Sequence, residues 1–344
     1  MEYQVVDPTT YPGWDELIRS HPDSSIFHLS GWAEVLKRAY GFSPHYILSV
    51  EESRLRFALP VLEIRSFLTG RRGVSLPFSD YCDPLTADIE SDFNILPWLI
   101  HYGKARGWEY IELRTRKELP EGVTPSETFF RHELELQHDP DRILRTFRDS
   151  TARNIRKAQK AGIEIRVDVS EEGVKEFYRL NCLTRRDHGL PPQPYRFFTL
   201  LHEHLMSKGF GFVVLALKNG VAISGNLYLH FGDRAYYKYG ASDSKYQDVR
   251  ANNLVMWEAI RWYTKKDFRS LCFGKTELFH DGLRQFKKGW GTRESKIHYL
   301  NYDMGKKEYI VRASHVRGFY NQFFRAMPIP VSKTIGSILY KHTA

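Results

Sequence analysis

The feature that most constrains this chain is a long internal repeat. Late in the first half, LPWLIHYGKARGWEYIELR has the pattern of an amphipathic helix, a break at Gly107 and a strand. Late in the second half, MWEAIRWYTKKDFRSLCFG has the same pattern at nearly the same length, so that Trp98 matches Trp257. A repeat of this size is too long for a solenoid unit. It predicts two copies of one folding unit rather than a single undivided core.

Each copy also contains an antiparallel hairpin upstream of that helix. In the first half, YILSVEESRLRFALPVLEI turns at Glu52-Ser53, and the second half turns at Asn219-Gly220 and again at Gly232-Asp233. Asn-Gly and Gly-Asp between apolar alternating runs are strong hairpin signals. Helical periodicity precedes each hairpin. The predicted fold class is therefore mixed α/β (α+β), with a tandem pair of largely antiparallel mixed sheets flanked by helices.

The domain boundary is expected near the middle of the chain. At 344 residues the chain exceeds the size at which one core usually keeps growing. The alternating strand FRHELELQ and the basic helix after it, residues 142–160, separate the halves. We place the first domain at 1–150 and the second at 151–305. Residues 306–344 form a helical tail, whose aromatic residues lead us to expect packing on the first domain.

Charge and composition point to a polyanionic partner in the cytoplasm. The net charge is +9, and basic residues concentrate in 141–160 and in the acid-free tail 311–344, although a solvated helix face would look the same. The N-terminus lacks a signal-peptide pattern, and no apolar run could span a bilayer. Cys82, Cys182 and Cys272 lie far apart and are expected to be reduced and buried. Peripheral contact with an anionic membrane surface remains open.

The unit order resembles that of a known family. A helix–hairpin–helix–strand unit resembles the GNAT acyltransferase fold, and two in tandem resemble the FemABX family of peptidoglycan aminoacyltransferases. Four segments carry the resemblance: FHLSGWAEVLKRAYGF, STARNIRKAQKAGIEI, TRRDHGLPPQPYRFF and GLRQFKKGWG. The pattern is most similar to FemAB-like members associated with exopolysaccharide and exosortase gene clusters. The coiled-coil arm of some family members has no counterpart in this sequence.

The resemblance implies an acyltransferase of cell-wall biogenesis with its active site between the two units. In the family, an amine of a cell-envelope (peptidoglycan or related glycan) precursor attacks the ester carbonyl of aminoacyl-tRNA. The alternative is an acyl-CoA-dependent N- or O-acyltransferase acting on an exopolysaccharide or its precursor. A non-catalytic binding protein is a third reading. No resident cofactor is implied, because the acyl donor is a co-substrate.

The donor site distinguishes the first two readings. GNAT units hold the CoA pyrophosphate on a glycine-containing loop at a helix N-terminus. The matching place in the second unit reads QDVRANNLVMWEA, without glycine, where Arg250 and the Asn252-Asn253 amides could partly substitute. In the first unit the matching place, TADIESDFNILPW, is acidic. The missing glycine in the second unit and the acidic stretch in the first both count against ordinary CoA binding.

The closing motif Phe286-Lys287-Lys288-Gly289-Trp290-Gly291 supplies the predicted catalytic group. Aminolysis of an ester needs positioning and stabilisation of the tetrahedral oxyanion. By resemblance, Lys287 would stabilise that anion, with Phe286 beside it and Trp290 at the substrate. A surface lysine in a plain turn is the alternative.

Further cations and a carboxylate complete the predicted site. Arg186, or its neighbour Arg185, resembles the family's phosphate-contacting position, and a guanidinium suits a pyrophosphate; pairing with Asp187 is the alternative. Lys37, following Trp32, would approach the same phosphates. Asp83, with Asp80 nearby, would accept the proton of the attacking amine, although Asp-Pro is also a common turn.

A tyrosine pair and two histidine clusters are further candidates. Tyr237 and Tyr239 lie on a predicted strand that could line the cleft, although alternation places one face of it in the core. A metal site is rejected at His202-Glu203-His204 and at His280-Asp281, because neither has zinc-ligand spacing.

Overall fold

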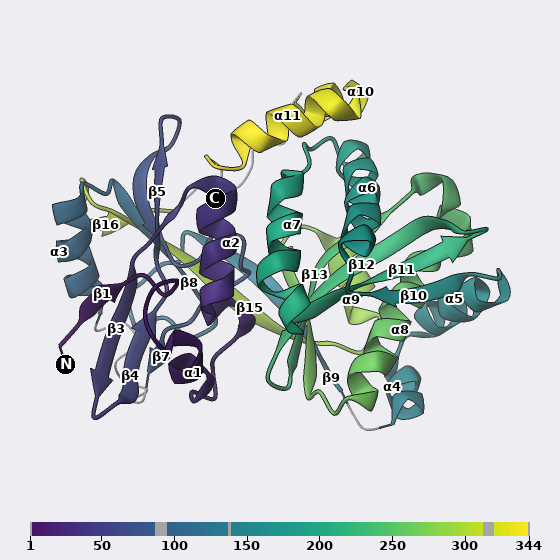
Figure 1. The fold of residues 1–344 in the computed structure, drawn as a ribbon, viewed down its shortest axis with the longest axis horizontal. Helices are drawn as coiled ribbons and strands as arrows, with labels where there is room; N and C mark the ends of the chain where they lie inside the picture. Colours follow the sequence, from purple (N-terminus) through teal and green to yellow (C-terminus); the bar gives the residue numbers. More distant parts are fainter. Residues whose placement is uncertain (1, 87–94, 137–138, 312–319, 343–344) are drawn as a thin grey trace. The chain divides into compact units, whose positions relative to one another are not determined.

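The computed structural model describes residues 2–86, 95–136, 139–311 and 320–342, and it divides the chain into two compact units. Unit 1 comprises Met1–Phe129, Lys296–His315 and Ile338–Ala344, and unit 2 comprises Phe130–Ser295 and Val316–Ser337. Figure 1 shows the elements of both units along the chain. The described helices include none that is long and apolar enough to cross a membrane.

Unit 1 is built on two small sheets. Its helices and strands are β1 (Gln4–Val6), α1 (Trp14–Arg19), η1 (Ile26–His28), α2 (Ser30–Tyr40), β2 (Ser43–Pro44), β3 (Tyr46–Glu51), β4 (Arg54–Leu59), β5 (Leu62–Ser66), β6 (Gly70–Val74), β7 (Leu85–Thr86), α3 (Leu96–Arg106), β8 (Tyr110–Thr115) and β16 (Glu308–Tyr309). One sheet has the order β1-β3-β4-β7, and the other continues β15-β8-β6-β5-β2, where β15 is Arg293–Asp303.

The predicted hairpin turn of unit 1 is confirmed. Glu52 and Ser53 join β3 to β4, and their φ angles are 48° and 62°. Two consecutive positive φ values define the type I′ turn, whose twist matches that of the paired strands. Asn219 and Gly220, with φ of 53° and 77°, make the equivalent turn in unit 2.

Unit 2 is a larger sheet covered on both faces. Its elements are β9 (Glu127–Glu135), α4 (Pro140–Thr146), α5 (Asp149–Lys160), β10 (Glu164–Asp168), α6 (Glu171–Asp187), α7 (Tyr195–His204), η3 (Met206–Lys208), β11 (Gly211–Lys218), β12 (Val221–Phe231), β13 (Arg234–Ser242), η4 (Ser244–Val249), α8 (Ala251–Lys265), β14 (Ser270–Glu277), α9 (Asp281–Lys288), α10 (Tyr320–Ala326) and α11 (Ile329–Leu339). The strand order is β10-β11-β12-β13-β14-β9.

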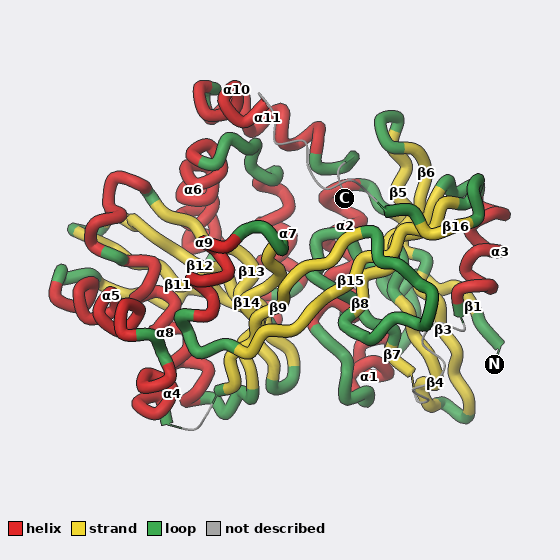
Figure 2. Tube along the Cα trace, turned by 180° about the vertical axis from the view of Figure 1, so that it is seen from behind, coloured by secondary structure: helices red, strands yellow, loops and turns green. Residues whose placement is uncertain are grey.

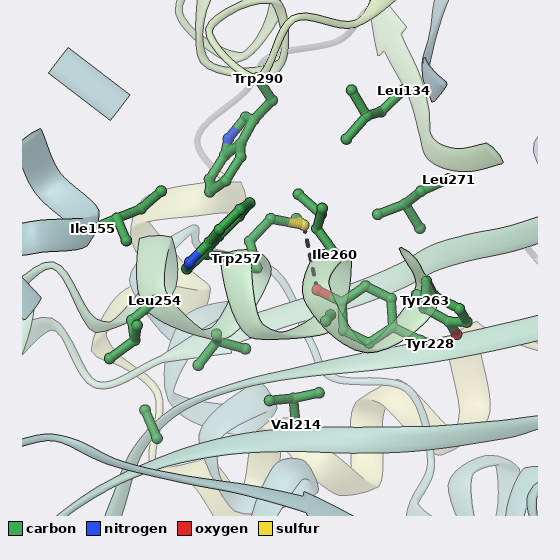
Figure 3. Close-up of a cluster of buried hydrophobic side chains, with 14 of the residues drawn as sticks. Leu134, Ile155, Val214, Tyr228, Leu254, Trp257, Ile260, Tyr263, Leu271 and Trp290 are labelled. Carbon is green, nitrogen blue, oxygen red and sulfur yellow. Dashed lines mark hydrogen bonds between the residues drawn. The ribbon is translucent and has the colours of Figure 1, made fainter. Parts of the chain in front are cut away.

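The layers of unit 2 follow from its sequence. Strand β11 is buried along almost its whole length, as expected for a strand covered on both faces. Helices α6 and α7 lie in front of the sheet in Figure 1, and α5 and α8 lie in front of it in the reverse view of Figure 2. Figure 3 shows the core between the sheet and α8, where Tyr228, Trp257 and Trp290 gather.

The predicted repeat is confirmed as a shared topology. In unit 1, helix α3 connects the parallel strands β6 and β8. In unit 2, helix α8 connects the parallel strands β13 and β14. All other strand pairs for which a register is available are antiparallel. A parallel pair requires a crossover, and the helix–break–strand pattern in each half encodes that crossover.

The units divide the chain differently from the expected boundaries at 150 and 305. Unit 2 begins at Phe130, within β9, so the basic helix α5 belongs wholly to it. The chain returns to unit 1 at Lys296, within β15. The reason is that strands, unlike loops, belong to the sheets in which they pair. The sequence pattern shows strands but not their partners.

The tail also departs from the expectation that it packs on the first domain. Of its described residues, 320–337 belong to unit 2, whereas 306–311 and 338–342 belong to unit 1. Helix α10 packs on α6, where Arg325 Nε donates to the Asp187 carbonyl oxygen at 3.1 Å. A Cβ on Gly189 would lie 2.2 Å from the Asn321 carbonyl oxygen, so this contact requires glycine.

Candidate functional site

A polar pocket of about 380 Å³ lies in unit 2, where α5 and α8 begin. Its lining comes from the start of α5, strands β12 and β13, η4, the start of α8 and helix α9. Two arginines and one carboxylate line it: Arg148, Arg250 and Asp243. A larger pocket of about 1060 Å³ beside α6 and α11 has three glutamates and three basic residues. The smaller pocket is therefore the better anion site, and we call it the α5–α8 pocket.

Two helix N-termini give the α5–α8 pocket its electrostatic character. The first N–H groups of a helix have no intrahelical acceptor, and the helix dipole is positive there. Arg148 precedes α5 and Arg250 precedes α8, so each N-terminus also carries a guanidinium. This combination favours phosphate groups.

Arg250 immediately precedes α8 and lines the α5–α8 pocket. Its φ is 59°, in the left-handed region that costs a non-glycine residue about 1–2 kcal/mol. Arg250 thus places a cation at the pocket from a backbone conformation that glycine adopts more readily. The sequence predicted the positive charge of Arg250 at this loop. Its left-handed backbone conformation is known only from the structure.

Arg148 is fixed by the neighbouring helix α9. Its Nη2 donates to the Gln285 carbonyl oxygen at 2.5 Å, and its backbone N donates to the Gly289 carbonyl oxygen at 2.9 Å. A Cβ on Gly289 would lie 2.9 Å from Thr151 Oγ1. Gly289 therefore permits close packing of α9 on α5.

The opposite wall is a chain of hydrogen bonds. Ser224 Oγ donates to Asn252 Oδ1 and also contacts the Ala241 carbonyl oxygen at 3.3 Å. Asn252 Nδ2 lies 3.5 Å from Ser242 Oγ. These contacts orient the Asn252 amide at the first turn of α8. Ser224 and Ser242 were not identified from the sequence, because serine on a strand carries no distinctive signal.

Phe286 and Lys287 are neighbours with different surroundings. Phe286 lines the pocket, is 38% exposed and packs edge-on against Trp290 at 6.2 Å between ring centroids. Lys287 is 4% exposed and does not line the pocket. Its Nζ donates to the carbonyl oxygens of Gly274 and Lys275 at 3.0 and 2.9 Å. In unit 2, the Lys287 ammonium therefore supports an irregular stretch of β14.

A buried histidine lies near Lys287. His132 on β9 is fully buried, and its Nε2 is 3.2 Å from Glu294 Oε2. Burial, together with the positive charge of Lys287, lowers the pKa of His132 to about 4. Arg284 binds Glu294 with two hydrogen bonds of 2.8 and 2.7 Å. His132 was not singled out from the sequence, because its partners are more than 150 residues away.

Asp83 is a buried anchor in unit 1. Its Oδ1 accepts from Thr115 Oγ1 and from the Arg116 backbone N, both at 2.8 Å, and its Oδ2 accepts from Arg116 Nε at 2.6 Å. Burial by itself would raise the pKa of Asp83, but the charge and hydrogen bonds of Arg116 hold it below its ordinary value. A carboxylate held in this way is a weak base, which argues against the predicted proton acceptance.

Four aromatic residues predicted to bind substrate pack within their units. Trp32 is fully buried in unit 1, and its ring centroid lies 5.0 Å from that of Phe27. Trp290 is fully buried in unit 2, 5.0 Å from Phe147. Tyr237 packs near Tyr228, and burial raises its pKa to about 12. Tyr239 is partly exposed and packs on Phe198 at 5.5 Å. Trp32 and Trp290 are core residues rather than surface ligands.

Of the predicted phosphate-binding cations, Lys37 belongs to unit 1, and Arg185 and Arg186 belong to unit 2. In unit 1, Lys37 Nζ is 2.8 Å from Asp7 Oδ2 and 3.1 Å from Thr9 Oγ1. In unit 2, Arg185 Nε donates to the Pro191 carbonyl oxygen at 3.3 Å. Arg186 lines an open pocket of about 490 Å³, with Asp187 Oδ1 4.0 Å from its Nε. Arg186 is therefore better placed than Arg185 to contact a phosphate from solvent.

The open pocket at Arg186 also receives a residue from the tail. Arg325 of α10 and His188 line it together with Arg186. The pocket shares Ser242 and Gln247 with the α5–α8 pocket, so the two lie side by side in unit 2. Arg325 was predicted only as part of a basic tail. Its contact with Asp187 of α6 joins residues far apart in sequence, which local patterns do not reveal.

Comparisons with known proteins agree with this architecture. Residues 145–288 match the family model described as an acetyltransferase (GNAT) domain. The Lipid II:glycine glycyltransferase of Staphylococcus haemolyticus is 31% identical over 99 residues, and that of Staphylococcus aureus is 31% identical over 98 residues. Each match covers 27% of this chain and 22% of the relative, about a fifth of its length.

Two solved structures share the fold over most of the chain. The crystal structure of FemX aligns with a TM-score of 0.68 at 17% identity, covering 89% of this chain and 98% of FemX. The structure of L-PGS from Bacillus licheniformis aligns with a TM-score of 0.56 at 9% identity, covering 98% and 99%. Residues 145–288 are therefore a GNAT domain, the fold class of acyltransferases. The chain as a whole shares the fold of FemX.

Proposed function

We propose that this chain is a FemABX-like aminoacyltransferase that moves an aminoacyl group from aminoacyl-tRNA to an amine of a cell-envelope precursor. The precursor is a peptidoglycan intermediate or a related glycan carrying phosphates. The partial match to Lipid II:glycine glycyltransferases supports the class of reaction. The GNAT domain supports acyl transfer in general.

The observation that carries the choice of donor is the continuity of positive charge along α5. The helix begins at the α5–α8 pocket, and Arg153, Arg156, Lys157 and Lys160 are exposed along it. Twelve residues of helix extend about 18 Å. A polynucleotide whose acyl-bearing end enters the pocket would place further phosphates along this face. Acyl-CoA would leave most of these cations unused.

The glycine-free loop at the start of α8 supports the same choice. The Ser224–Asn252 hydrogen bond and the Arg250 side chain lie where a CoA-binding loop would present bare backbone. The alternative, an acyl-CoA-dependent N- or O-acyltransferase acting on an exopolysaccharide or its precursor, predicts tight CoA binding at this loop.

The proposed reaction is a simple aminolysis. The amine nitrogen of the acceptor forms a bond to the ester carbonyl carbon, giving a tetrahedral oxyanion. The bond from that carbon to the ribose oxygen then breaks, the amine loses a proton and the ribose oxygen gains one. The site must hold both reactants and stabilise the oxyanion. Backbone N–H groups at the two helix N-termini and Arg250 are suited to the phosphates of the donor.

Acceptor phosphates fit the open pocket at Arg186. Two guanidinium groups, Arg186 and Arg325, face one carboxylate there, that of Asp187. A diphosphate linkage can accept from both guanidinium groups at once. Because this pocket adjoins the α5–α8 pocket within unit 2, donor and acceptor phosphates could be held next to each other.

The decisive experiment compares acyl donors. The purified chain would be incubated with tRNA charged with radiolabelled amino acids or with labelled acyl-CoA, each with a cell-envelope precursor extract. We expect label to pass from tRNA into an alkali-stable amide, and this transfer to fall in Arg250→Ala. Lys265→Ala is the matched control, because it removes an exposed cation from the far end of the same helix. Transfer from acyl-CoA alone would establish the alternative.

A further inference from the structure

The β5–β6 hairpin of unit 1 exposes two large apolar side chains at its tip. Phe67 is 81% exposed and Leu68 is 57% exposed. Both lie between Ser66, where β5 ends, and Gly70, where β6 begins. Figures 1 and 2 both show this hairpin projecting from its sheet. Neighbouring apolar residues held in water at a projecting tip indicate a contact with something outside the chain.

The tip is held in place by the end of the chain. Thr69 Oγ1 and Arg72 Nη2 both donate to the His342 carbonyl oxygen at 3.0 Å. His342 Nδ1 lies 3.0 Å from Ser66 Oγ, and its ring packs edge-on against Phe67 at 4.5 Å between centroids. Ser66 Oγ also accepts from the backbone N of Leu68 and Thr69 at 3.1 and 2.9 Å. The exposure therefore belongs to an ordered tip.

The charge around the tip is mainly positive. The Arg65 side chain is 64% exposed, and Lys341 is exposed beside His342. Glu63 is buried and accepts from Arg65, Arg71 and Arg106, so its negative charge is offset. Glu109 is exposed and accepts from the Arg71 backbone N. Apolar residues flanked by cations are typical of elements that enter an anionic membrane interface.

We propose that the β5–β6 tip docks on an anionic lipid bilayer, with Phe67 and Leu68 entering the boundary between headgroups and acyl chains. Arg65 and Lys341 would lie at the level of the lipid phosphates. A second protein is a poorer fit, because a stable interface needs roughly 800 Å² from each partner, far more than two side chains supply. A bilayer requires no matching shape. This surface does not depend on which acyl donor or acceptor the chain uses.

A membrane anchor of this size is weak, so it needs both its apolar side chains and its cations. A few buried apolar groups alone give marginal membrane binding, and cations near anionic lipids add to it. We therefore expect reversible binding that requires anionic lipid and weakens with added salt. Neutral vesicles should bind the chain poorly.

The test is cosedimentation of the full chain with phosphatidylcholine vesicles that contain or lack phosphatidylglycerol. We expect Phe67→Ser with Leu68→Ser to weaken binding by about tenfold or more. Lys341→Gln should weaken it by about two- to fivefold. Val221→Ser is the matched control, since Val221 is 54% exposed beside a hairpin turn of unit 2. It should bind as the unmodified chain does.

A second readout places the tip at the bilayer. Leu68→Cys carrying an environment-sensitive dye should show a blue-shifted emission with anionic vesicles, while Cys82, Cys182 and Cys272 are buried and resist labelling. Unchanged emission, or equal sedimentation of the double serine variant and the control, would overturn the proposal. A concentration-dependent dimer that only the double variant abolishes, without an effect on vesicle binding, would overturn it in favour of a protein contact.

Discussion

Lys287 donates from its buried ammonium group to the carbonyl oxygen of Gly274, 3.0 Å away, at the point where β14 has a left-handed backbone conformation with φ of 72°. A second hydrogen bond reaches the adjacent Lys275 carbonyl oxygen. These contacts give Lys287 a structural role in addition to the catalytic one predicted from the closing motif. The two roles make different predictions.

We predict that Lys287→Met destabilises unit 2 as well as lowering transfer. The buried Gly274 carbonyl and the partly buried Lys275 carbonyl would lose a charged donor, which costs about 2–3 kcal/mol. Urea unfolding would measure the loss of stability and the charged-tRNA assay the loss of transfer. Lys287→Arg, which keeps a cation, should recover part of the stability. An unchanged unfolding midpoint for Lys287→Met would contradict the structural role, and an unchanged rate would remove the catalytic one.

Substitutions at Arg250 separate the effect of its charge from the effect of its backbone conformation in the α5–α8 pocket. Arg250→Gly relieves the left-handed conformation, so it should be more stable than Arg250→Ala by about 1 kcal/mol. Both variants lack the guanidinium and should bind donor about equally weakly. Calorimetric unfolding and tRNA titration would measure the two effects. Donor binding retained in either variant would exclude Arg250 from the site.

The exposed face of α5 should contribute salt-dependent binding of tRNA. Replacing Arg153, Arg156 and Lys157 by Ala should weaken tRNA binding and reduce the slope of log affinity against log salt by up to about 3, if each cation meets a phosphate. Filter binding between low and moderate salt would measure this slope. Replacing three exposed lysines distant from α5 in sequence, Lys104, Lys208 and Lys307, is the charge-matched control. Equal slopes in the two variants would argue against an RNA-binding face.

The first and last glycines of the segment GLRQFKKGWG, residues 282–291, should tolerate alanine unequally. Gly291 has φ of 70°, and a Cβ there would lie 2.5 Å from Thr146 Oγ1, so Gly291→Ala should cost about 2 kcal/mol or more. Gly282, earlier in the same region, has open space around its missing Cβ. Gly282→Ala should instead stabilise α9 by about 0.5–1 kcal/mol. Thermal unfolding of both variants checks the contrast, and similar effects would contradict it.

Stability should fall in mild acid because His132 resists protonation in the folded state. Burial and the charge of Lys287 lower its folded-state pKa to about 4, against an ordinary value of 6.5. Between those values the unfolded chain binds a proton that the folded chain excludes, so stability is lost as pH falls from 6.5 towards 4. The total loss from this group is about 3 kcal/mol.

The measurement is urea unfolding at several pH values for the unmodified chain and for His132→Gln. Other histidines also have lowered pKa values, so only the difference between the two proteins isolates His132. The variant should lose less stability on acidification. An identical pH dependence would show that His132 does not contribute in this range.

The sequence alone determined the repeated order of elements. Its signals are local: Glu52-Ser53 and Asn219-Gly220 adopt the positive φ values of their turns, and the patterns ending in Gly107 and Lys265 form the crossover helices. These features depend on backbone preferences and on the spacing of apolar residues within a few turns. Distant parts of the chain are not needed to establish them.

Only the tertiary structure decided which polar residues meet. Arg148, Ser224, Arg250 and Phe286 come from four separate segments and line one pocket, while Lys287, next to Phe286 in sequence, turns inward to β14. Asp83 and Trp290 look functional in their motifs, but their partners bury them. Burial and hydrogen bonding depend on contacts between segments far apart in sequence. Local sequence patterns do not reveal which of those contacts form.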